Sequence, residues 1–597
     1  MEDSKKETVQ DNIIEKKPTF SGRKNIVSAK CLSGKEFFFS TETLQQNPRI
    51  KFELPTAISN RRYLAGKLVI PITRFTETEM LLENSSILSS SPETLKAKIQ
   101  MEEFLSLLER KKIEDYELPI KLKHPLAPFQ NKGINYLVTA LSAHPDFHCA
   151  LLGDAVGSGK TVQAIVAALI LKQQGVIDNC LIICPASLKR KWGEEITKFT
   201  DADYSLAING AEGRYECYTA NTMFRIVNYD VLHRDIQTIL PAVSDRTLII
   251  ADEIQYCKNW KAKRTKAVRK IVDKTDKKIL MSATFMENRL EELFSVAQIL
   301  DPTILGWTFT HFDERYIDRD WWGKATTYKR TDEIKDYLRP FLIRRRKDEI
   351  RAEMGTLMAE KVIENDYYVT LHPEQRKIYD EIRKNISTSI MDAEKADKIT
   401  LAPIIAQLIY LQQACLDTSL VGGDKQISTK LDELLKFMES VDEESKVVIF
   451  CHFTKMVEII GKALKDAGWN TIYVYGSQTS QAERSEVIKR FSEDPKVQVL
   501  VSSDILKEGV DLQAASYLVN FDLLWNPKSM EQRAGRIDRP GQKAETINII
   551  NIIAQGTIEE RIHEVIKEKR ELFTDIIDDG KIEKRLSLRV IKDLLEI

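Results

Sequence analysis

One stretch decides the fold of this chain: Gly153-Asp154-Ala155-Val156-Gly157-Ser158-Gly159-Lys160-Thr161. It follows the apolar run Cys149–Leu152 and precedes the helix-like segment Val162–Leu169. A strand, a glycine loop, Lys-Thr and a helix in this order form a phosphate cradle, because backbone N–H groups of the loop and the helix N-terminus point at the phosphates. The lysine reaches the β and γ oxygens, and the threonine hydroxyl binds Mg²⁺. The stretch therefore predicts a nucleotide site made by residues 157–161, with Thr161 on the metal.

The match to the phosphate-binding pattern is incomplete at one position. The strict pattern has Gly six residues before the lysine, where this chain has Asp154. Glycine loops followed by Lys-Thr also occur in surface turns. The stretch alone leaves the surface-turn alternative open, and other motifs of the chain are needed to choose between a nucleotide site and a turn.

Short apolar runs alternate with helical patterns in two parts of the chain. Such runs, apolar on both faces, are typical of a parallel sheet covered by helices. The predicted strands are Ala150–Leu152, Cys180–Cys184, Phe224–Asn228, Leu248–Ala251 and Lys278–Met281, then Val447–Cys451, Thr471–Val474, Val497–Ser502, Tyr517–Asn520 and Thr546–Asn551. The alternation predicts an α/β protein with two tandem, doubly wound parallel-sheet lobes and helical insertions.

The predicted organisation has six parts. They are a disordered tail (1–30), an N-terminal α+β accessory region (31–115), lobe 1 (116–300), helical insertions (301–440), lobe 2 (441–575) and a C-terminal helical tail (576–597). In the accessory region we expect strands at Glu36–Phe39 and Lys67–Ile72, a serine-rich turn at 85–91 and an amphipathic helix at Thr94–Leu108.

Composition limits the possible partners and compartments. The 597 residues carry a formal net charge of −1, so a polyanion must be bound by a local patch. The eight cysteines include no C-x-x-C pair, which disfavours zinc ribbons and disulfide frameworks. The N-terminus has no secretory apolar region, and no run approaches the roughly 18 apolar residues of a membrane span. We expect an intracellular protein with no membrane contact.

An apolar strand followed by two acids, Leu248–Glu253, is the second chemical feature. At the carboxyl edge of a parallel sheet the first acid, Asp252, can hold Mg²⁺ together with Thr161. The second, Glu253, can act as the general base that aligns the attacking water. Gln255 is then placed to sense the γ-phosphate. An acidic pair after a strand is otherwise a solvated turn.

The segment Met281–Thr284 ends another predicted strand. Its small hydroxyl residues could relay the state of the nucleotide to the second lobe, or the segment is a plain turn at the end of a strand.

The strongest single stretch is Asn526–Gln542, which contains Gly535-Arg536-Ile537-Asp538-Arg539. Arg536 and Arg539 are three residues apart, so on a helical turn they share a face. Two arginines facing a γ-phosphate from another domain would be arginine fingers, each worth about 10³–10⁵ in rate. The alternative is a solvated charged helix.

Together these motifs resemble those of the superfamily 2 helicase-like ATPases, and within them the Swi/Snf-type DNA translocases. The resemblance covers roughly residues 115–575, in the family's order. It also rests on Phe129-Gln130 with Gly133, Leu181–Pro185 with Trp192 and Glu195, Asn228-Tyr229-Asp230, Thr284 with Asn288 and Glu292, Phe341–Lys347, Val448–Thr454, Tyr475-Gly476-Ser477 with Arg484 and Phe491, and Ser502–Gln513.

The resemblance implies two RecA-like lobes that bind ATP and Mg²⁺ between them and use double-stranded DNA as the track. It adds Gln130, Asp154, Gly509 and Asp511 to the nucleotide-binding residues, and it implies a monomer. The family's usual Glu, His and Pro are replaced here by Ala155, Gln255 and Phe285.

The motif style is similar to that of prokaryotic members, including the RNA-polymerase-recycling ATPase of bacteria. This favours a bacterial, archaeal or viral source, with the protein in the cytoplasm or nucleoid, or in the nucleus if the source is eukaryotic. It also makes RNA polymerase, or another DNA-bound protein, the expected partner.

Two basic segments are candidates for the DNA contact. The first is the run Lys258–Lys278, with ten cations and only Asp273 and Asp276 opposed, although it could equally be a solvated helix face. By resemblance, the second is Arg344–Lys347, which supplies Arg345, Arg346 and Lys347, with Lys189 added from the first DNA-strand motif. Residues 61–71 faintly resemble the accessory repeat of annealing helicases, with protein docking or a purely structural role as alternatives.

The sequence thus predicts an ATP-dependent motor that translocates on duplex DNA and remodels or displaces protein–DNA complexes. One rival is a helicase that separates the strands of DNA or RNA. The other, of a different class, is a scaffold that binds nucleotide and DNA without turnover.

Overall fold

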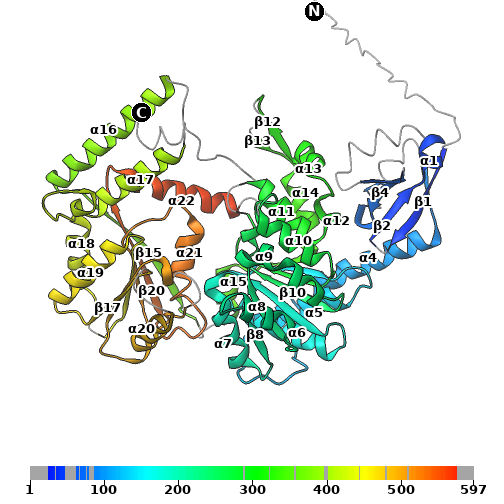
Figure 1. Cartoon of the computed structure of the whole chain (residues 1–597), viewed down its shortest axis with the longest axis horizontal. Helices are drawn as coiled ribbons and strands as arrows, with labels where there is room; N and C mark the ends of the chain where they lie inside the picture. The colour runs from blue at the N-terminus through cyan, green and yellow to red at the C-terminus, as the bar shows by residue number, and fades with distance from the viewer. Residues whose placement is uncertain are drawn as a thin grey trace, which may run out of the picture. The chain divides into compact units, whose positions relative to one another are not determined.

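The computed structural model describes residues 25–33, 35–46, 62–65, 67–74, 77–78, 86–286, 289–321, 323, 325–354, 358–395, 401–442, 444–476, 481–506 and 510–574. Contacts divide the chain into two compact units, 1–99 and 100–597 (Figure 1). The predicted C-terminal tail, most of the predicted disordered tail, and Gly509 and Asn288 lie outside the described residues.

The first unit is built on a five-stranded sheet with the order β3-β4-β2-β1-β5. Its strands are β1 (Asn25–Ser33), β2 (Glu36–Phe39), β3 (Arg62–Leu64), β4 (Lys67–Pro71) and β5 (Ser86–Ser90), with helix α1 (Thr41–Gln46) and the 3₁₀ turn η1 (Ile72–Arg74). Strands β2 and β4 are confirmed. The end of the predicted disordered tail is instead strand β1, and the predicted serine-rich turn is strand β5. These two strands pair with each other in parallel across the unit, which local composition does not reveal.

The second unit begins within helix α4 (Pro92–Lys111), which covers the helix predicted at Thr94–Leu108. Lobe 1 follows as a seven-stranded sheet with the order β14-β6-β11-β10-β7-β9-β8, and every neighbouring pair is parallel. The strands are β6 (Cys149–Leu152), β7 (Asn179–Cys184), β8 (Tyr204–Leu206), β9 (Phe224–Asn228), β10 (Thr247–Asp252), β11 (Lys278–Met281) and β14 (Leu342–Ile343). The helices are α5 (Pro128–Ser142), α6 (Lys160–Gln173), α7 (Lys189–Phe199), α8 (Gly210–Thr219), α9 (Tyr229–Ile239), α10 (Lys263–Val272) and α11 (Leu290–Leu300).

This strand order brings three chemical segments together. Strands β6, β11 and β10 are neighbours, and in a parallel sheet their carboxyl ends meet at one edge. The glycine loop leaves β6, Ser282–Thr284 leaves β11, and the acids leave β10. The loop and the acids are almost 100 residues apart in sequence, yet only one strand separates them in the sheet.

Lobe 2 is a six-stranded sheet with the order β15-β20-β19-β16-β18-β17, again parallel throughout. Its strands are β15 (Lys361–Val369), β16 (Val447–Phe450), β17 (Thr471–Val474), β18 (Val499–Ser502), β19 (Tyr517–Asn520) and β20 (Thr546–Ala554). Helices α19 (Thr454–Asp466), α20 (Gln481–Glu493), α21 (Pro527–Ala534) and α22 (Ile558–Thr574) follow its strands. All ten strands predicted for the two lobes are present.

The segment between the lobes is more varied than the helical insertion that we predicted. It contains helices α12 (Pro302–Leu305), α13 (Phe309–Tyr316), α14 (Thr331–Leu338), α15 (Lys347–Met354), α16 (Pro373–Lys395), α17 (Leu401–Leu416) and α18 (Thr429–Glu439). It also forms the hairpin β12 (Ile317–Arg319) and β13 (Ala325–Tyr328), and it supplies β14 to lobe 1 and β15 to lobe 2. The connecting segment is therefore part of both sheets.

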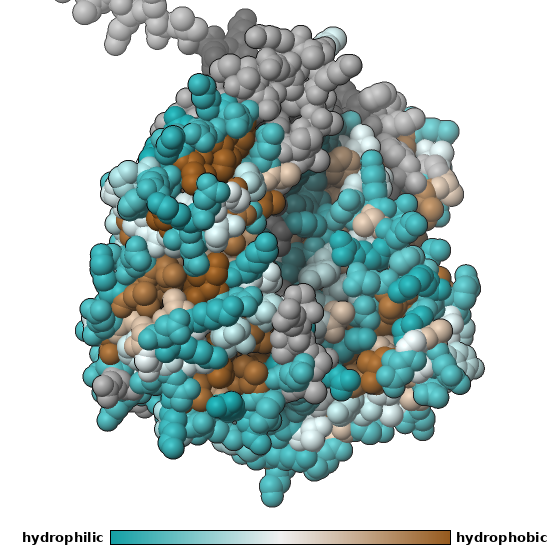
Figure 2. All heavy atoms as spheres, turned by 60° about the vertical axis from the view of Figure 1, so that its left-hand side comes forward, coloured by the Kyte–Doolittle hydropathy of each residue, from teal (hydrophilic) through white to brown (hydrophobic). Residues whose placement is uncertain are grey.

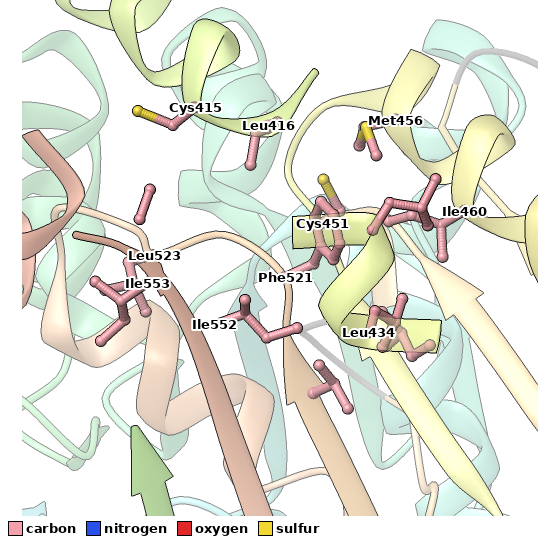
Figure 3. Packing of buried hydrophobic residues seen from close by; sticks show 14 of the residues in the cluster. Cys415, Leu416, Leu434, Cys451, Met456, Ile460, Phe521, Leu523, Ile552 and Ile553 are labelled. Carbon is pink, nitrogen blue, oxygen red and sulfur yellow. The ribbon is translucent and has the colours of Figure 1, made fainter. Parts of the chain in front are cut away.

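Helices α17, α18 and α19 bury their apolar faces against the lobe 2 sheet (Figure 3). Burying one large apolar side chain contributes roughly 1.5–3 kcal/mol, so this cluster is a main source of the lobe's stability. The labelled residues are Cys415, Leu416, Leu434, Met456 and Ile460 from the helices, and Cys451, Phe521, Leu523, Ile552 and Ile553 from the strands and the residues just after them.

The surface shown in Figure 2 is mainly hydrophilic, with hydrophobic residues in separate patches. Scattered hydrophobic surface of this kind is ordinary for a folded protein. Within the part of the chain that the structure describes, no helix combines the length and the apolar character needed to cross a bilayer.

Candidate active site

The glycine loop between β6 and α6 has the backbone shape of a phosphate cradle. Gly157 and Gly159 both have left-handed φ angles, +81° and +77°. A Cβ on Gly157 would lie 2.9 Å from Cγ of Arg539, and one on Gly159 would lie 2.4 Å from Nε2 of Gln130. Both positions therefore require glycine for conformation, and Gly157 also lacks space for a side chain.

Gln130 and Lys160 hold this loop in place. Gln130 donates from Nε2 to the carbonyl of Ser158, 3.0 Å away, while its Oε1 accepts from the backbone N–H of Ala127. Nζ of Lys160 donates to the carbonyls of Asp154 and Ala155 at 2.7 and 3.1 Å. Burial lowers the pKa of Lys160, against the nearby carboxylates, which raise it.

The loop fits a phosphate group and its metal. The hydroxyl of Ser158 is buried and has no hydrogen-bond partner among the described residues, an orphaned donor of the kind that a ligand satisfies. Thr161 and Asp252, the two predicted Mg²⁺ ligands, line the same cavity. A hydroxyl and a carboxylate are the oxygen donors that Mg²⁺ prefers.

The two acids after β10 have different surroundings. Asp252 is buried, and its Oδ2 accepts from Nε1 of Trp192 at 2.9 Å, while its backbone carbonyl accepts from the hydroxyl of Tyr229. Burial raises the pKa of Asp252, and the adjacent Glu253 raises it further. A bound cation would favour the ionised form of Asp252.

Glu253 is held ionised by cations from both lobes. Burial works to raise the pKa of Glu253, but the ammonium groups of Lys528 and Lys160 outweigh burial and lower it. Its Oε2 accepts from Nζ of Lys528 at 2.9 Å and from Nε2 of Gln255. Oε1 of Gln255 in turn accepts from the hydroxyl of Ser282, which also lies 2.6 Å from the carbonyl of Thr284. A continuous polar path thus joins Glu253 to the segment after β11.

Lobe 2 contributes three predicted residues from two neighbouring segments. Arg536 is buried and donates to the carbonyls of Gln532 and Val510 at 3.0 and 3.1 Å. Arg539 donates to the carbonyl of Gly535 and forms an ion pair with Asp511. Asp511 also accepts from Nζ of Lys191 of lobe 1 at 3.1 Å. Burial works to raise the pKa of Asp511, but Arg539 and Lys191 outweigh it and lower the value to about 2.

The two halves enclose one cavity of about 270 Å³. Ligand sites occur preferentially in clefts between domains, where polar groups converge on the ligand and fix its orientation. The predicted residues that line it are Gln130, Gly157, Gly159, Lys160, Thr161, Asp252, Glu253, Asp511, Arg536 and Arg539. The sequence prediction therefore named residues of both walls.

Asp154 does not line the cavity, although it was predicted to bind the nucleotide. It is fully buried and accepts from the backbone N–H and the guanidinium of Arg345, and from Nε2 of Gln163. Strand β14 pairs with β6 and brings Arg345 to this position. A buried carboxylate needs such partners. Asp154 therefore anchors the segment after β14 beneath the glycine loop.

The residues predicted to bind nucleic acid have other partners. The guanidinium of Arg345 also lies over the ring of Phe129. Lys347 donates to the carbonyls of Val156 and Asp538, so it joins the glycine loop to lobe 2, and burial lowers the pKa of Lys347 to about 8. Lys189 donates to the carbonyl of Ala207. Only Arg346 is half exposed, 3.6 Å from the carboxylate of Asp348.

Helix α10 presents the other predicted basic surface. Lys261, just before the helix, and Lys263, Lys266 and Lys270 on it are exposed and form no ion pair within the described residues, while Arg264 lies 3.9 Å from Asp230. At the end of the run, Lys278 is buried and donates to the carbonyls of Ile299 and Leu300, so it is not part of this surface. We define the α10 basic face as Lys261, Lys263, Lys266 and Lys270.

Several residues that link the two lobes were missed by the sequence prediction. Lys191 and Lys528 each form an ion pair across the cleft, and Asp538 accepts from Lys347 and Arg351. Lys528 lies two residues after Asn526, inside the stretch that we quoted, but nothing local distinguishes it from a surface lysine.

The chain is similar to known proteins over most of its length. The family described as the SNF2-related domain matches residues 129–420, and the helicase conserved C-terminal domain matches residues 429–541. The putative ATP-dependent helicase/translocase YwqA of Bacillus subtilis is 27% identical over 503 residues, which cover 81% of this chain and 52% of that protein.

A eukaryotic relative and a solved structure are also similar. The TATA-binding protein-associated factor mot1 of Aspergillus fumigatus is 25% identical over 558 residues, covering 82% of this chain and 29% of that protein. The Sulfolobus solfataricus SWI2/SNF2 ATPase core in complex with dsDNA is 28% identical, with a TM-score of 0.38, covering 81% of this chain and 99% of that one. The chain spans about half the length of the Bacillus relative and less than a third of mot1.

Proposed function

Because the chain belongs to the SNF2-type ATP-dependent helicases and translocases, we propose that it is an ATP-driven motor that moves along double-stranded DNA. The observation that carries this proposal is the cavity between the lobes. Its lobe 1 wall holds the glycine loop and two acids, and its lobe 2 wall holds Arg536 and Arg539. A site divided in this way links hydrolysis to the movement of one lobe against the other.

Each wall has its own part in hydrolysis. The backbone of residues 157–161 and the ammonium of Lys160 bind the phosphates, and Glu253 accepts a proton from the attacking water. Arg536 and Arg539 neutralise the charge that develops on the γ-phosphate. Thr161 and Asp252 would hold Mg²⁺, which would supply positive charge to offset the negative charge of the phosphates.

The path from Glu253 through Gln255 to Ser282 gives lobe 1 a way to register the state of the nucleotide. Gln255 contacts Glu253 with its amide nitrogen and Ser282 with its amide oxygen. A shift of Glu253 during the cycle therefore changes the contacts of the segment after β11. We propose that this path relays the nucleotide state, as the alternative to a plain turn.

The α10 basic face supports contact with the DNA backbone. Its four exposed lysines form no ion pair within the described residues, and phosphate contacts of this kind give binding that is independent of sequence and sensitive to salt.

We propose that the motor acts as a monomer inside the cell, and that it displaces RNA polymerase or another DNA-bound protein. The similarity to a TATA-binding protein-associated factor supports a DNA-bound target.

Steady-state ATP hydrolysis with and without duplex DNA tests the proposal. We expect duplex DNA to stimulate hydrolysis, and we expect the motor to displace a triplex-forming strand while the duplex stays paired. A stalled RNA polymerase on duplex DNA should be released in an ATP-dependent manner.

Three outcomes would contradict parts of this proposal. The scaffold alternative predicts binding of ATP and DNA with no stimulation by any nucleic acid. The strand-separating alternative predicts unwinding of a tailed duplex of DNA or RNA. Stimulated hydrolysis without release of RNA polymerase would still support a DNA-dependent motor but would exclude RNA polymerase as its target.

A further inference from the structure

Lys528 of lobe 2 reaches across the cleft to the proposed general base. Its Nζ lies 2.9 Å from Oε2 of Glu253, and both side chains are largely buried, with 6% and 18% of their surface exposed. A charge-assisted hydrogen bond in such surroundings is stronger than one at the surface. Lys528 therefore makes a largely buried contact across the cleft.

The contact leaves one oxygen of Glu253 available. Oε2 accepts from Lys528 and from Gln255, whereas no donor among the described residues reaches Oε1. A carboxylate anchored by one oxygen keeps a defined orientation for the other. Oε1 is thus the oxygen that can take up a water.

Helix α21 carries Lys528 as a rigid part of lobe 2. Its first turn is capped by Asn526, whose side chain accepts from the backbone N–H of Lys528 at 3.0 Å. At its other end, Arg533 is fully buried and pairs with Asp504 and Asp522 at 2.9 and 3.1 Å. The position of the Lys528 ammonium therefore follows the position of lobe 2.

We propose that Lys528 is a positioning residue of the ATPase site, which orients Glu253 through Oε2 and does so only when lobe 2 is closed on lobe 1. The inference rests on the proposed function and deepens it. Closure then has two consequences at once: it brings Arg536 and Arg539 to the cleft, and it completes the orientation of the base. Hydrolysis in the open arrangement is slow because Glu253 lacks its cross-lobe partner.

The test compares Lys528→Met, Lys528→Gln and Lys528→Arg in the full-length chain, using steady-state ATP hydrolysis with saturating duplex DNA. We expect Lys528→Met and Lys528→Gln to lower kcat by about 10²-fold, the cost of a base displaced by about 1 Å. The KM for ATP and the equilibrium affinity for ATP should change little, because Lys528 acts on the base. Lys528→Arg should restore most of kcat.

Lys462→Met is the matched control. Lys462 also lies on a helix of lobe 2 and forms an ion pair, with Glu458, but its side chain is 63% exposed and far from the chemistry in sequence. We expect this control variant to have the same kcat, the same KM and the same thermal unfolding temperature as the wild type. If Lys528→Met fails to fold, Lys528→Gln, which keeps a polar side chain at this position, carries the test.

The outcomes distinguish a failure of the proposed function from a failure of the role proposed for Lys528. Absence of DNA-stimulated hydrolysis in the wild type overturns the proposed function, and the inference with it. If the wild type shows DNA-stimulated hydrolysis but Lys528→Met and Lys528→Gln have an unchanged or higher kcat, only the inference is overturned. A higher kcat would mean that Lys528 restrains the base and slows turnover. A parallel loss of ATP affinity also overturns it, because Lys528 would then bind nucleotide.

Discussion

Glu253 adopts a backbone conformation that few non-glycine residues adopt. Its φ is +51°, in the left-handed region, although it carries a full side chain. Such a conformation costs on the order of 1–3 kcal/mol and persists where the surroundings hold it. Here the bonds from Lys528 and Gln255 hold the side chain in the cleft. The strain is thus located at the residue that we assign as the base.

The variant Glu253→Gln tests this assignment. It keeps the shape and the contact with the cleft but cannot accept a proton, so we expect ATP binding to persist while turnover falls by about 10²–10⁴-fold. Nucleotide affinity and single-turnover hydrolysis measure the two effects separately. Lys160→Ala is the contrasting variant and should weaken both binding and turnover. Retained turnover in Glu253→Gln would mean that another group is the base.

Helix α10 has one face that packs in the core of lobe 1 and an opposite, exposed face that carries lysines. Thr265, Val268 and Ile271 are buried against lobe 1, while the α10 basic face points outward. The buried face follows from the helical spacing of its apolar residues. The exposed lysines contribute little to folding and are free to serve binding.

The triple variant Lys263→Gln, Lys266→Gln, Lys270→Gln should weaken DNA binding without unfolding the protein. Each lost phosphate contact reduces the slope of log affinity against log salt by about 0.9, so three contacts predict a change of about 2.7. Binding to a fluorescent duplex at several salt concentrations measures the slope.

A charge-matched control distinguishes a specific surface from net charge. Lys462, Lys465 and Lys489 are exposed on α19 and α20 of lobe 2. Their triple Gln variant removes the same charge, and we expect a salt slope close to that of the wild type. Equal slopes in both triple variants would contradict the assignment of the α10 basic face.

At the scale of the whole molecule, the cleft is closed by ion pairs between segments far apart in the chain. Asp511 joins Arg539 to Lys191 of lobe 1, and Lys528 reaches Glu253, 275 residues away. Neither lobe contains the complete site. The catalysis that we propose therefore depends on how the lobes meet as well as on the residues of each.

The variant Arg539→Ala tests this dependence. It removes a guanidinium of lobe 2 that lies against the glycine loop and leaves the lobe 1 wall intact. We expect ATP affinity to fall little and DNA-stimulated turnover to fall by about 10³–10⁵-fold, the contribution of an arginine finger. Turnover within tenfold of the wild type would show that Arg539 does not act on the phosphate.

The predicted strands of both lobes could be read from the sequence because they depend on local patterns. Apolar runs of four to six residues, such as those of β10 and β16, identify buried parallel strands without knowledge of their partners. The spacing within residues 153–161 likewise predicted the phosphate cradle. Gly157 and Gly159 have the left-handed φ angles that such a loop needs.

Contacts between distant segments were decided only by the tertiary structure. Strands β14 and β15 are short or polar on one face, and they become strands because β6 and β20 offer them free edges. Asp154 pairs with Arg345 across 191 residues, so the motif residue that we assigned to the nucleotide instead supports the loop.

The glycine loop with which the sequence prediction began is thus one half of a site. By itself, the sequence determined which residues we predict to carry the chemistry, Lys160 and Asp252 among them, because these predictions follow from side-chain type and local spacing. Only the tertiary structure decided which lobe 2 residues contact the lobe 1 wall: Lys528 pairs with Glu253, and Arg539 lies beside Gly157. The physical reason is that a cross-lobe contact depends on the packing of two separately folded sheets, and no local pattern encodes that distance.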